Sequence, residues 1–503
     1  MPLTLVAPAP SPIWEYQFRY YQAMQALATD LFHHLDDDLD PQVLLLGLPT
    51  AAGEPARFLE PVDGELPAAP FDDALVRGRA IEANTTWPYS ERFDVSPAMT
   101  RRKLQGIGVR LAVQQTLDGL DEDTAHKHIA GWPVDISGHL VLTVLRLRRK
   151  PLQAYPSLRP DRYYTNGRPL APSLLLSAVQ RFIEEGVKAL TEPEPGASII
   201  VRPRDTEELL RAAGRSFLDT PTQALGFDPA NTTLFATCNT ISSLRYEGAE
   251  GVGQLLLAKR GHPNLTEIFA LTCPTELTDY RAVRKLLEMT TPDVHLLADG
   301  EHVYALGRLK GQYDAAREDL FVISFVTHYA WELQHAGQVL LRSHYGLPGL
   351  PRTRLSRSSF RRDLRRTFGV TDAGRVGQLW DIVLAASKQA SGTLLVITTE
   401  ALAEADRLKL QCTLIEPVVL TPLITSLVTS IDGAVLLDPD GYCYSIGVIL
   451  DGRASGRGDS TRGARYNSAL RYVESSEHPC LAVVVSEDGL VDVITSANIS
   501  EKE

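Results

Sequence analysis

Hydrophobic and polar positions along the first part of the chain alternate between a helical and a strand-like pattern. Residues 14–35 and 173–190 carry apolar side chains at helical spacing, whereas residues 42–47 and 139–148 are short apolar runs of strand length. Such alternation predicts an α/β domain over residues 1–195. The segment that follows, Thr-Glu-Pro-Glu-Pro-Gly at 191–196, is rich in residues that break regular structure and is expected to be a linker.

Residues 197–345 repeat this alternation and are predicted to form a second α/β domain. Strands are expected at 253–258, 267–271 and 320–325, and a helix at 280–289. Two further apolar runs flank Asp299-Gly300, a dipeptide typical of tight β-hairpin turns.

Histidines in these two domains were weighed as candidate metal ligands. His328, Glu332 and His335 would share one face of a helix, as in some metal sites, but they lack the H-E-x-x-H order of zinc proteases. A half-buried helix packed on the sheet is the favoured interpretation. His126 and His128 do not share a helix face, and we expect them at the surface.

The composition changes over residues 346–371. Glycines and prolines interrupt regular structure at 346–351, and seven arginines then accompany a single acid, Asp363. This segment is predicted to be an arginine-rich linker or helix. A solvated basic helix that pairs with acidic surface is favoured over a contact with nucleic acid or nucleotide phosphates, although the latter stays open. The arginines are Arg352, Arg354, Arg357, Arg361, Arg362, Arg365 and Arg366.

The last part, residues 372–503, is predicted to be a mixed β-sheet flanked by helices. Strand-like runs at 393–398, 433–437, 444–450, 481–485 and 491–494 are separated by helical patterns at 376–384, 420–427 and 463–473. The whole chain is therefore expected to be a multidomain α/β (α+β) protein.

Bulk properties narrow the class of protein. The net charge of −12 argues against general nucleic-acid binding by the whole molecule. Five scattered cysteines without a C-x-x-C pair suit a reducing compartment, and no apolar run is long enough to span a bilayer. The N-terminus lacks the features of a signal peptide. A cytoplasmic protein without membrane attachment is expected.

The candidate chemistry lies between residues 430 and 492. A strand beginning near Asp432-Gly433-Ala434 is followed by a loop rich in Gly, Arg and Ser, a helix that starts at Gly463, and a strand that ends in Ser486-Glu487. Backbone N–H groups at the start of a helix attract anions, and carboxylates at strand ends can hold Mg²⁺. This order of elements suits a phosphate-handling site.

These motifs resemble the diadenylate cyclase (DAC, DisA N-terminal) family over roughly residues 372–499. Asp432-Gly433-Ala434 matches the family's DGA motif. Gly463, Arg465 and the alanine at 469 match its Gly-Thr-Arg-His-Arg-x-Ala motif, and Ser486-Glu487 matches its Ser-Glu strand end. No family is identified for residues 1 to about 370.

The resemblance implies a nucleotidyltransferase that condenses two ATP into cyclic di-AMP with Mg²⁺ or Mn²⁺, and it implies a homodimer or larger oligomer because each domain holds one ATP. Asp432 would bind the metal together with Glu487, and Gly433 would allow close approach of the nucleotide. Catalysis would involve Asp432, Gly433 and Arg465. The other nucleotide-binding residues implied are Leu414, Ala434, Gly463, Asn467, Ser468, Ser486 and Glu487.

The second motif departs from the family, since its Thr-Arg-His-Arg becomes Ala464-Arg465-Tyr466-Asn467. The retained Asp432 favours an active cyclase regulated by the N-terminal region. The altered motif favours a degenerate sensor of an adenine nucleotide or cyclic dinucleotide in signalling or defence, and a relic domain with a structural role is the third alternative. The sequence does not decide between turnover and sensing, nor what the first 370 residues detect, which nucleotide is preferred, or which partner is served.

Overall fold

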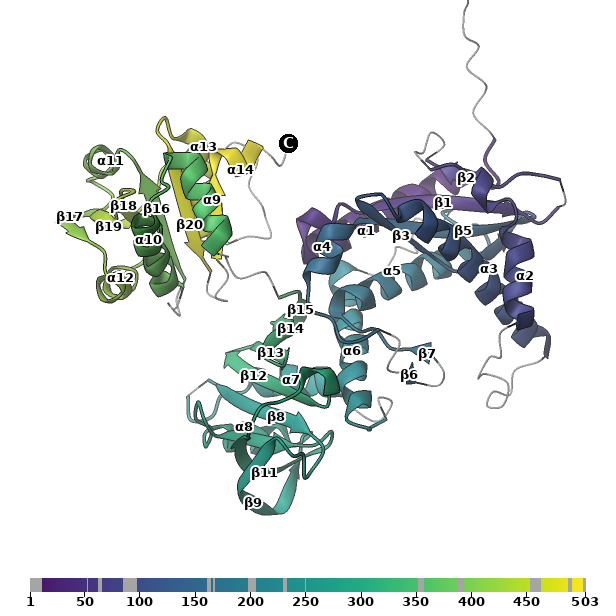
Figure 1. Cartoon of the computed structure of the whole chain (residues 1–503), viewed down its shortest axis with the longest axis horizontal. Helices are drawn as coiled ribbons and strands as arrows, with labels where there is room; N and C mark the ends of the chain where they lie inside the picture. The colour runs from purple at the N-terminus through teal and green to yellow at the C-terminus, as the bar shows by residue number, and fades with distance from the viewer. Residues whose placement is uncertain are drawn as a thin grey trace, which may run out of the picture. The chain divides into compact units, whose positions relative to one another are not determined.

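The computed structural model describes residues 11–51, 53–61, 66–84, 97–160, 164–165, 168–197, 205–228, 233–248, 250–351, 357–387, 389, 392–452, 463–486 and 491–500. The chain divides into two compact units, Met1–Pro351 and Arg352–Glu503, and each is described by itself (Figure 1). Among the described residues, no helix is long and apolar enough to cross a membrane.

The first part of the N-terminal unit consists of helices on both faces of a five-stranded sheet, ordered β2-β1-β5-β3 with β4 beside β5. Alternate residues of β1 and β5 point to opposite faces: Leu45 and Leu145 pack with α1 and α5, whereas Leu46 and Leu142 pack with α3. Both faces are covered, which is why these strands read as continuous apolar runs. The main elements are α1 (Gln17–Leu35), β1 (Gln42–Pro49), β2 (Arg57–Glu60), α2 (Ala74–Asn84), α3 (Pro97–Asp121), β3 (His126–Ala130), β4 (Val134–Ile136), β5 (His139–Arg148), α4 (Arg149–Ala154), β6 (Tyr164–Thr165), β7 (Arg168–Pro169) and α5 (Leu174–Leu190).

The second part of this unit is built on an eight-stranded sheet with the order β15-β14-β13-β12-β8-β10-β11-β9. The hairpin predicted around Asp299-Gly300 is present, since β10 and β11 pair antiparallel on either side of it. The elements are α6 (Thr206–Ala224), α7 (Leu234–Ser243), β8 (Gly253–Ala258), β9 (Leu265–Glu276), α8 (Tyr280–Leu287), β10 (His295–Ala298), β11 (His302–Leu309), β12 (Leu320–Thr327), β13 (Ala330–His335), β14 (Gln338–His344) and β15 (Leu347–Gly349).

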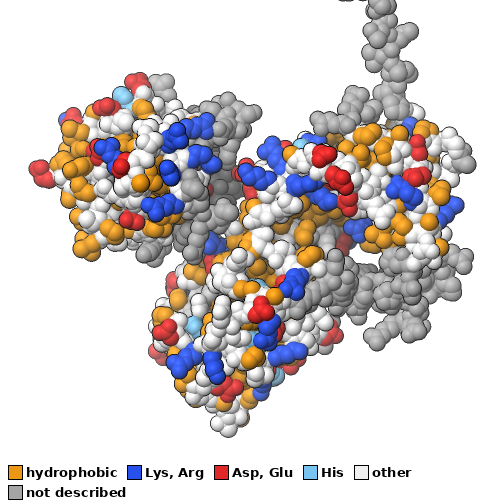
Figure 2. All heavy atoms as spheres, viewed as in Figure 1, with side chains coloured by type: hydrophobic (Ala, Val, Ile, Leu, Met, Phe, Trp, Pro, Cys, Tyr) orange, Lys and Arg blue, Asp and Glu red, His pale blue; other side chains and the backbone are white. Residues whose placement is uncertain are grey.

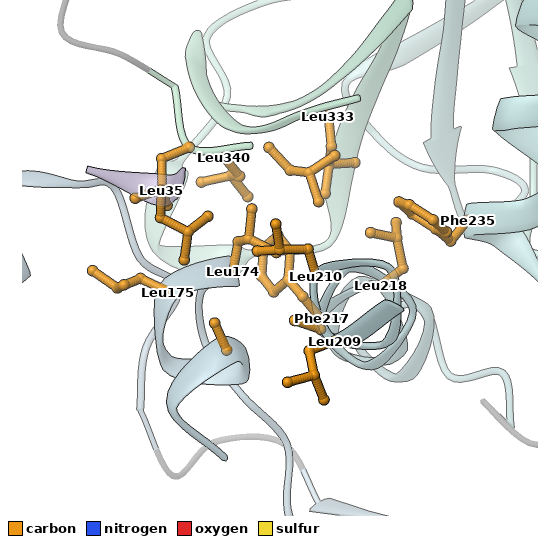
Figure 3. Close-up of a cluster of buried hydrophobic side chains, with 14 of the residues drawn as sticks. Leu35, Leu174, Leu175, Leu209, Leu210, Phe217, Leu218, Phe235, Leu333 and Leu340 are labelled. Carbon is orange, nitrogen blue, oxygen red and sulfur yellow. The ribbon is translucent and has the colours of Figure 1, made fainter. Parts of the chain in front are cut away.

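One hydrophobic core joins the two parts of the N-terminal unit. Leu174 of α5, Leu210 and Phe217 of α6, and Leu333 of β13 belong to the same cluster of buried side chains and point toward one another (Figure 3). The boundary expected near residue 196 therefore does not separate two cores. The four-part division of the sequence stays a prediction.

The helix expected at His328, Glu332 and His335 is wrong. These residues lie on the β12–β13 hairpin, where the strand period of two replaces the helical period and the three side chains do not share a face. Glu332 forms an ion pair with Arg342, whose Nε lies 2.8 Å from Oε1 of Glu332, while His335 is buried beside Tyr313. The helix was expected because His328, Glu332 and His335 are spaced as on one helix face, although the intervening residues alternate as in a strand.

The surface position expected for His128 is also wrong. His128 lies on β3, is buried, and its Nδ1 is 2.6 Å from a carboxylate oxygen of Asp121, which is itself buried at the end of α3. On a strand, residues two apart share a face, so His126 and His128 both point to the same side of β3.

The C-terminal unit contains a mixed sheet, as predicted; it has six strands in the order β17-β19-β18-β16-β20-β21, of which β17 was not predicted. β16 and β18 are parallel, and the other neighbours are antiparallel. The elements are α9 (Arg357–Phe368), α10 (Ala373–Ala386), β16 (Thr393–Thr398), α11 (Ala401–Arg407), β17 (Thr413–Val419), α12 (Pro422–Val428), β18 (Ala434–Leu437), β19 (Tyr442–Val448), α13 (Ala464–Ser475), β20 (Cys480–Val485), β21 (Val491–Thr495) and α14 (Ser496–Ser500).

Helices cover both faces of this sheet. Leu395 and Val483 pack against α9 and α10 on one face, and Val396 and Val484 pack against α11 and α13 on the other. The arginine-rich segment thus contributes a helix to this unit, because Phe360 of α9 is buried in the first of these cores.

Candidate functional site

The loop between α12 and β18 brings Asp432 and Gly433 to one end of the strands of the C-terminal sheet, where β16 and β18 begin and β20 ends. This end of the strands is called the sheet edge below. Gly433 has a φ of 106°, and a Cβ at this position would lie 2.6 Å from the carbonyl carbon of Gly447. Gly447 lies on β19, close to where the pairing of β18 with β19 is irregular. Glycine is needed at 433 because two backbones cross here. Its expected role in letting a nucleotide approach stays a prediction.

Asp432 and Arg465 form an ion pair across this edge. Nη2 of Arg465 donates a hydrogen bond to Oδ1 of Asp432 at 3.0 Å. The Asp432 side chain is 91% exposed and that of Arg465 is 34% exposed, so both charges are within reach of a solvent-borne ligand. The carboxylate and the guanidinium come from a loop and a helix start that are 33 residues apart, and the structure brings them together.

The start of α13 is the second component of this edge. Gly463 is the N-cap residue, and it has no side chain with which to cap the helix. The Gly463 carbonyl accepts hydrogen bonds from the backbone N–H of Asn467 at 3.3 Å and from its side-chain amide at 3.4 Å. Asn467 therefore closes the first turn, and Ser468 is half-buried one position further on. A helix N-terminus carries partial positive charge and favours anions.

Strand pairing places the remaining predicted residues of the described chain near the same edge. Leu394 pairs with Ala434, and Thr393 pairs with Val485, so Ser486 follows β20 at the edge where β18 begins. Ala434 itself is fully buried, so its expected contact with a nucleotide stays a prediction.

Leu414 lies on the edge strand β17, one residue beyond the Thr413–Ile446 pair. Its side chain is 49% exposed. It is therefore accessible from solvent on this side of the sheet.

Metal-binding capacity at this edge depends on carboxylates. Glu487 lies outside the described residues. Within the described parts of the chain, no group of three or more His, Cys, Asp or Glu side chains could hold a metal ion. Mg²⁺ is commonly bound by one or two carboxylates together with substrate phosphates and water, so the exposed Asp432 fits a metal that arrives with a nucleotide rather than one held by protein ligands alone.

A network of charged groups beside this edge was not anticipated from the sequence. Arg407 of α11 donates to both carboxylate oxygens of Glu404 and to both of Asp451, at 2.6–2.9 Å, and the Tyr472 hydroxyl of α13 donates to Glu404 at 2.7 Å. The guanidinium lowers the pKa of the Glu404 and Asp451 carboxyls, and these carboxylates raise the pKa of Arg407. The network ties α11 to α13 and to the segment after β19.

The only sequence signal for this network was an opposite charge pair three residues apart on α11. Such a pair is common on helix surfaces and worth little by itself. Its longer-range partners, Asp451 and Tyr472, become neighbours only in the folded sheet.

A cavity of about 250 Å³ lies elsewhere, in the N-terminal unit. Threonine and carboxylate side chains line it next to the start of α7, among them Thr233, Thr237, Glu276 and Glu301. It contains none of the predicted site residues.

The C-terminal unit is thus an α/β domain with an anion-attracting helix start, an arginine and an exposed carboxylate at one sheet edge. This class of site suits a phosphate-bearing ligand. Residues 382–499 match the model of the family described as "DisA bacterial checkpoint controller nucleotide-binding". The resemblance to diadenylate cyclases in the C-terminal quarter is thereby confirmed, and the match supports a cyclase-like or nucleotide-binding role for this part of the chain.

The N-terminal unit matches two further families that were not identified from the sequence. Residues 13–218 match the model described as "Probable sensor domain DACNG", and residues 232–337 match "Probable sensor domain DACNH". Both matches lie ahead of the nucleotide-binding match.

Solved structures with sequence similarity cover a quarter of the chain. One is a double-cysteine mutant of DacA from Staphylococcus aureus, with 19% identity, a TM-score of 0.20, and coverage of 26% of this chain and 91% of that one. Another is a hypothetical membrane spanning protein from Bacillus cereus, with 20% identity, a TM-score of 0.21, and coverage of 26% and 64%. No curated protein matches the chain.

Proposed function

We propose that the C-terminal unit binds ATP at the edge formed by Asp432, Gly433 and the start of α13, and that two copies together condense two ATP molecules into cyclic di-AMP. The observation that carries this proposal is the ion pair between Asp432 and Arg465. Two groups suited to opposite parts of a metal-bound triphosphate, a carboxylate for the cation and a guanidinium for the phosphates, lie within 3.0 Å of each other.

In this reaction, the 3′-hydroxyl oxygen of each nucleotide forms a bond to the α-phosphorus of the other. The bond between that phosphorus and the β-phosphate bridging oxygen breaks, and pyrophosphate leaves. Arg465 and the backbone N–H groups at the start of α13 would stabilise negative charge on the phosphates. Asp432 would accept the hydroxyl proton or orient the hydroxyl. Phosphate would compete with Asp432 for Arg465, and binding would release the carboxylate for this task.

Mg²⁺ or Mn²⁺ would be held by Asp432 and, as the resemblance implies, by Glu487. When bound, it would neutralise phosphate charge and activate the attacking hydroxyl.

The reaction needs two sites facing each other, and exposed apolar side chains close to Asp432 support self-association. Leu423 and Leu427 of α12 are 71% and 62% exposed, and Ile431 next to Asp432 is 49% exposed. Hydrophobic side chains gather over α12 and β17 of this unit in the space-filling view (Figure 2). A second copy of the chain would remove these side chains from water.

Matches to probable sensor domains support a regulatory role for the N-terminal unit, which would control turnover in response to a signal. The alternative function is a nucleotide or cyclic-dinucleotide sensor without turnover, and the altered second motif favours it. Loss of one cationic phosphate ligand removes about 1.5–3 kcal/mol of charge-assisted hydrogen bonding, or one to two decades in rate if it acts only in the transition state.

The deciding experiment incubates the full-length protein with ATP and Mg²⁺ or Mn²⁺ and analyses products by mass spectrometry. Cyclic di-AMP is expected from the wild-type protein, and Asp432→Asn is expected to abolish it while ATP binding persists. Asp440→Asn, which changes an exposed carboxylate in the β18–β19 turn, is the matched control and should leave synthesis unchanged.

Measurable ATP binding without any dinucleotide product in either metal would establish the sensor alternative. Absence of both binding and product would overturn the proposed function altogether.

A further inference from the structure

Helix α9 presents an unusual concentration of positive charge within an otherwise acidic unit. Seven arginines and one aspartate fall within residues 352–366, whereas the rest of the C-terminal unit holds ten basic and eighteen acidic residues. Figure 2 shows Lys and Arg side chains gathered over the position of α9. Five of the seven arginines, Arg357, Arg361, Arg362, Arg365 and Arg366, lie on α9, so this helix concentrates positive charge within the unit.

The described arginines of this helix are all exposed. Arg357, Arg361 and Arg365 are exposed and recur every four residues, so they form one stripe about 12 Å long, while Arg362 and Arg366 extend it on one side. The opposite face holds Phe360 and Leu364, which are fully buried in the sheet core. Packing of α9 thus fixes the direction of the arginines.

Three arginines of α9 are not paired with an acid among the described residues of their own unit. Among the described residues, the side chains of Arg357, Arg361 and Arg365 make no hydrogen bond or ion pair. Asp363, the only acid of the segment, is 6% exposed and lies 3.9 Å from Arg362. The pairing with acidic surface that the sequence favours is therefore not made by this stripe within the described residues of its own unit.

We propose that this arginine stripe binds the phosphate backbone of duplex nucleic acid without reading its sequence. Guanidinium groups bind phosphate with two parallel hydrogen bonds, and a row of them on a rigid helix can contact several phosphates at once. Unpaired bases are disfavoured as ligands because they require exposed aromatic side chains for stacking, and Phe360 is buried.

An anionic membrane fits this helix less well. Interfacial helices insert large apolar side chains beside their cationic ones, and the apolar residues of α9 are committed to the protein core. The arginine stripe is positively charged and carries no hydrophobic surface. These properties suit binding to the phosphate backbone of a duplex.

The test measures fluorescence anisotropy of a labelled DNA duplex of arbitrary sequence with the full-length protein as salt increases from about 50 to 200 mM. We expect binding at low salt that weakens steeply, with each phosphate contact adding about 0.9 to the slope of log affinity against log salt. The triple variant Arg357→Gln, Arg361→Gln and Arg365→Gln should lower this slope by about 3 and weaken binding at least about tenfold at low salt.

Arg375→Gln is the matched control, because this exposed arginine of the same unit already pairs with Asp440 at 2.8 Å. It should bind duplex like the wild type. All three stripe arginines are exposed, so the triple variant should keep the thermal midpoint of the wild type. The proposal would be overturned if the duplex stayed unbound at low salt or if the slope were unchanged in the triple variant. It would also be overturned if single strands bound more tightly than the duplex, or if anionic vesicles or polyglutamate bound and the duplex did not.

Discussion

At the residue scale, the site depends on two side chains and one glycine that serve different purposes. Asp432 and Arg465 are charged, accessible and paired, and they can change partners when a ligand arrives. Gly433 holds the loop in a conformation that other residues rarely adopt, with its backbone against Gly447. In the DGA motif, Asp432 therefore supplies an accessible charge and Gly433 supplies a backbone conformation. The two can be tested separately.

Replacement of Gly433 by Ala should destabilise the C-terminal unit, because a Cβ would meet the Gly447 backbone at 2.6 Å on top of an unfavourable φ. We expect a loss of at least about 1–3 kcal/mol, or about 2–10 °C in the midpoint of thermal unfolding by calorimetry. Gly377→Ala is the control, since α10 is helical at this position and a Cβ would meet only the tip of the Arg357 side chain. An equal midpoint for both variants would contradict this explanation of Gly433.

At the element scale, the sheet edge is assembled from segments that are held in place by contacts outside the motifs. The Arg407 network connects α11, the segment after β19, and α13, whose first turn carries Arg465. The same reasoning applies to α9, whose buried face determines which way its arginines point. Elements outside the candidate-site motifs thus position the elements that carry these motifs.

The Arg407 network predicts a dependence of stability on acid pH. Arg407 lowers the pKa of Glu404 and Asp451 in the folded state relative to their unfolded values near 4, so their stabilisation is complete above about pH 5 and is lost as the pH falls through the folded values. Arg407→Gln should lower the free energy of unfolding by about 1 kcal/mol at neutral pH. It should also flatten the acid limb, which is the part of the stability curve that falls as the pH is lowered below about 5.

Urea unfolding followed between pH 3 and 7 would measure the effect. Lys409→Gln, which removes the exposed ion pair with Asp406 nearby, should leave the acid limb unchanged. Parallel acid limbs for the wild type and Arg407→Gln would show that these carboxyls are not stabilised by the guanidinium.

At the scale of the whole molecule, the chain consists of two units with separate hydrophobic cores. None of the clusters of buried side chains spans the two units, since the N-terminal clusters end at Leu350 and the C-terminal ones begin at Phe360. The matches follow this division, with probable sensor domains in the first unit and the nucleotide-binding match in the second. Communication between a signal and the nucleotide site would therefore act between units that fold around their own cores.

Self-association through the C-terminal unit predicts that the double variant Leu423→Ser and Leu427→Ser is monomeric where the wild type is a dimer or larger. Each leucine removed from water contributes about 1.5–3 kcal/mol, so the dissociation constant should rise by at least about 100-fold. Light scattering coupled to size exclusion would measure the mass. Leu309→Ser, at a 48% exposed position of the N-terminal unit, is the control and should not change it.

A wild-type protein that is monomeric at every concentration, or a double variant that still associates, would contradict this interface. Loss of cyclic di-AMP synthesis in the double variant together with intact ATP binding would link assembly to turnover.

The sequence by itself determined most of the strands and helices of the C-terminal unit, and its motifs proposed the candidate site residues, whose roles stay predictions. These predictions depended on local information: apolar runs such as 393–398 and 481–485, the DGA motif, and a glycine at a helix start. Apolar residues recur every two positions in a strand and every 3.6 positions in a helix. This spacing depends only on neighbours along the chain, so it can be read before the chain is folded.

Only the tertiary structure decided which distant residues meet. The pairs Asp432–Arg465 and Arg407–Asp451 join segments that no local pattern relates. His128 and Asp121 are only seven residues apart, but their burial against each other depends on how β3 packs on the end of α3. His335 was misassigned for the same reason, because its hairpin is defined by pairing across strands rather than by spacing along one. Pairing and burial are long-range outcomes of packing, so they become visible only once the chain is folded.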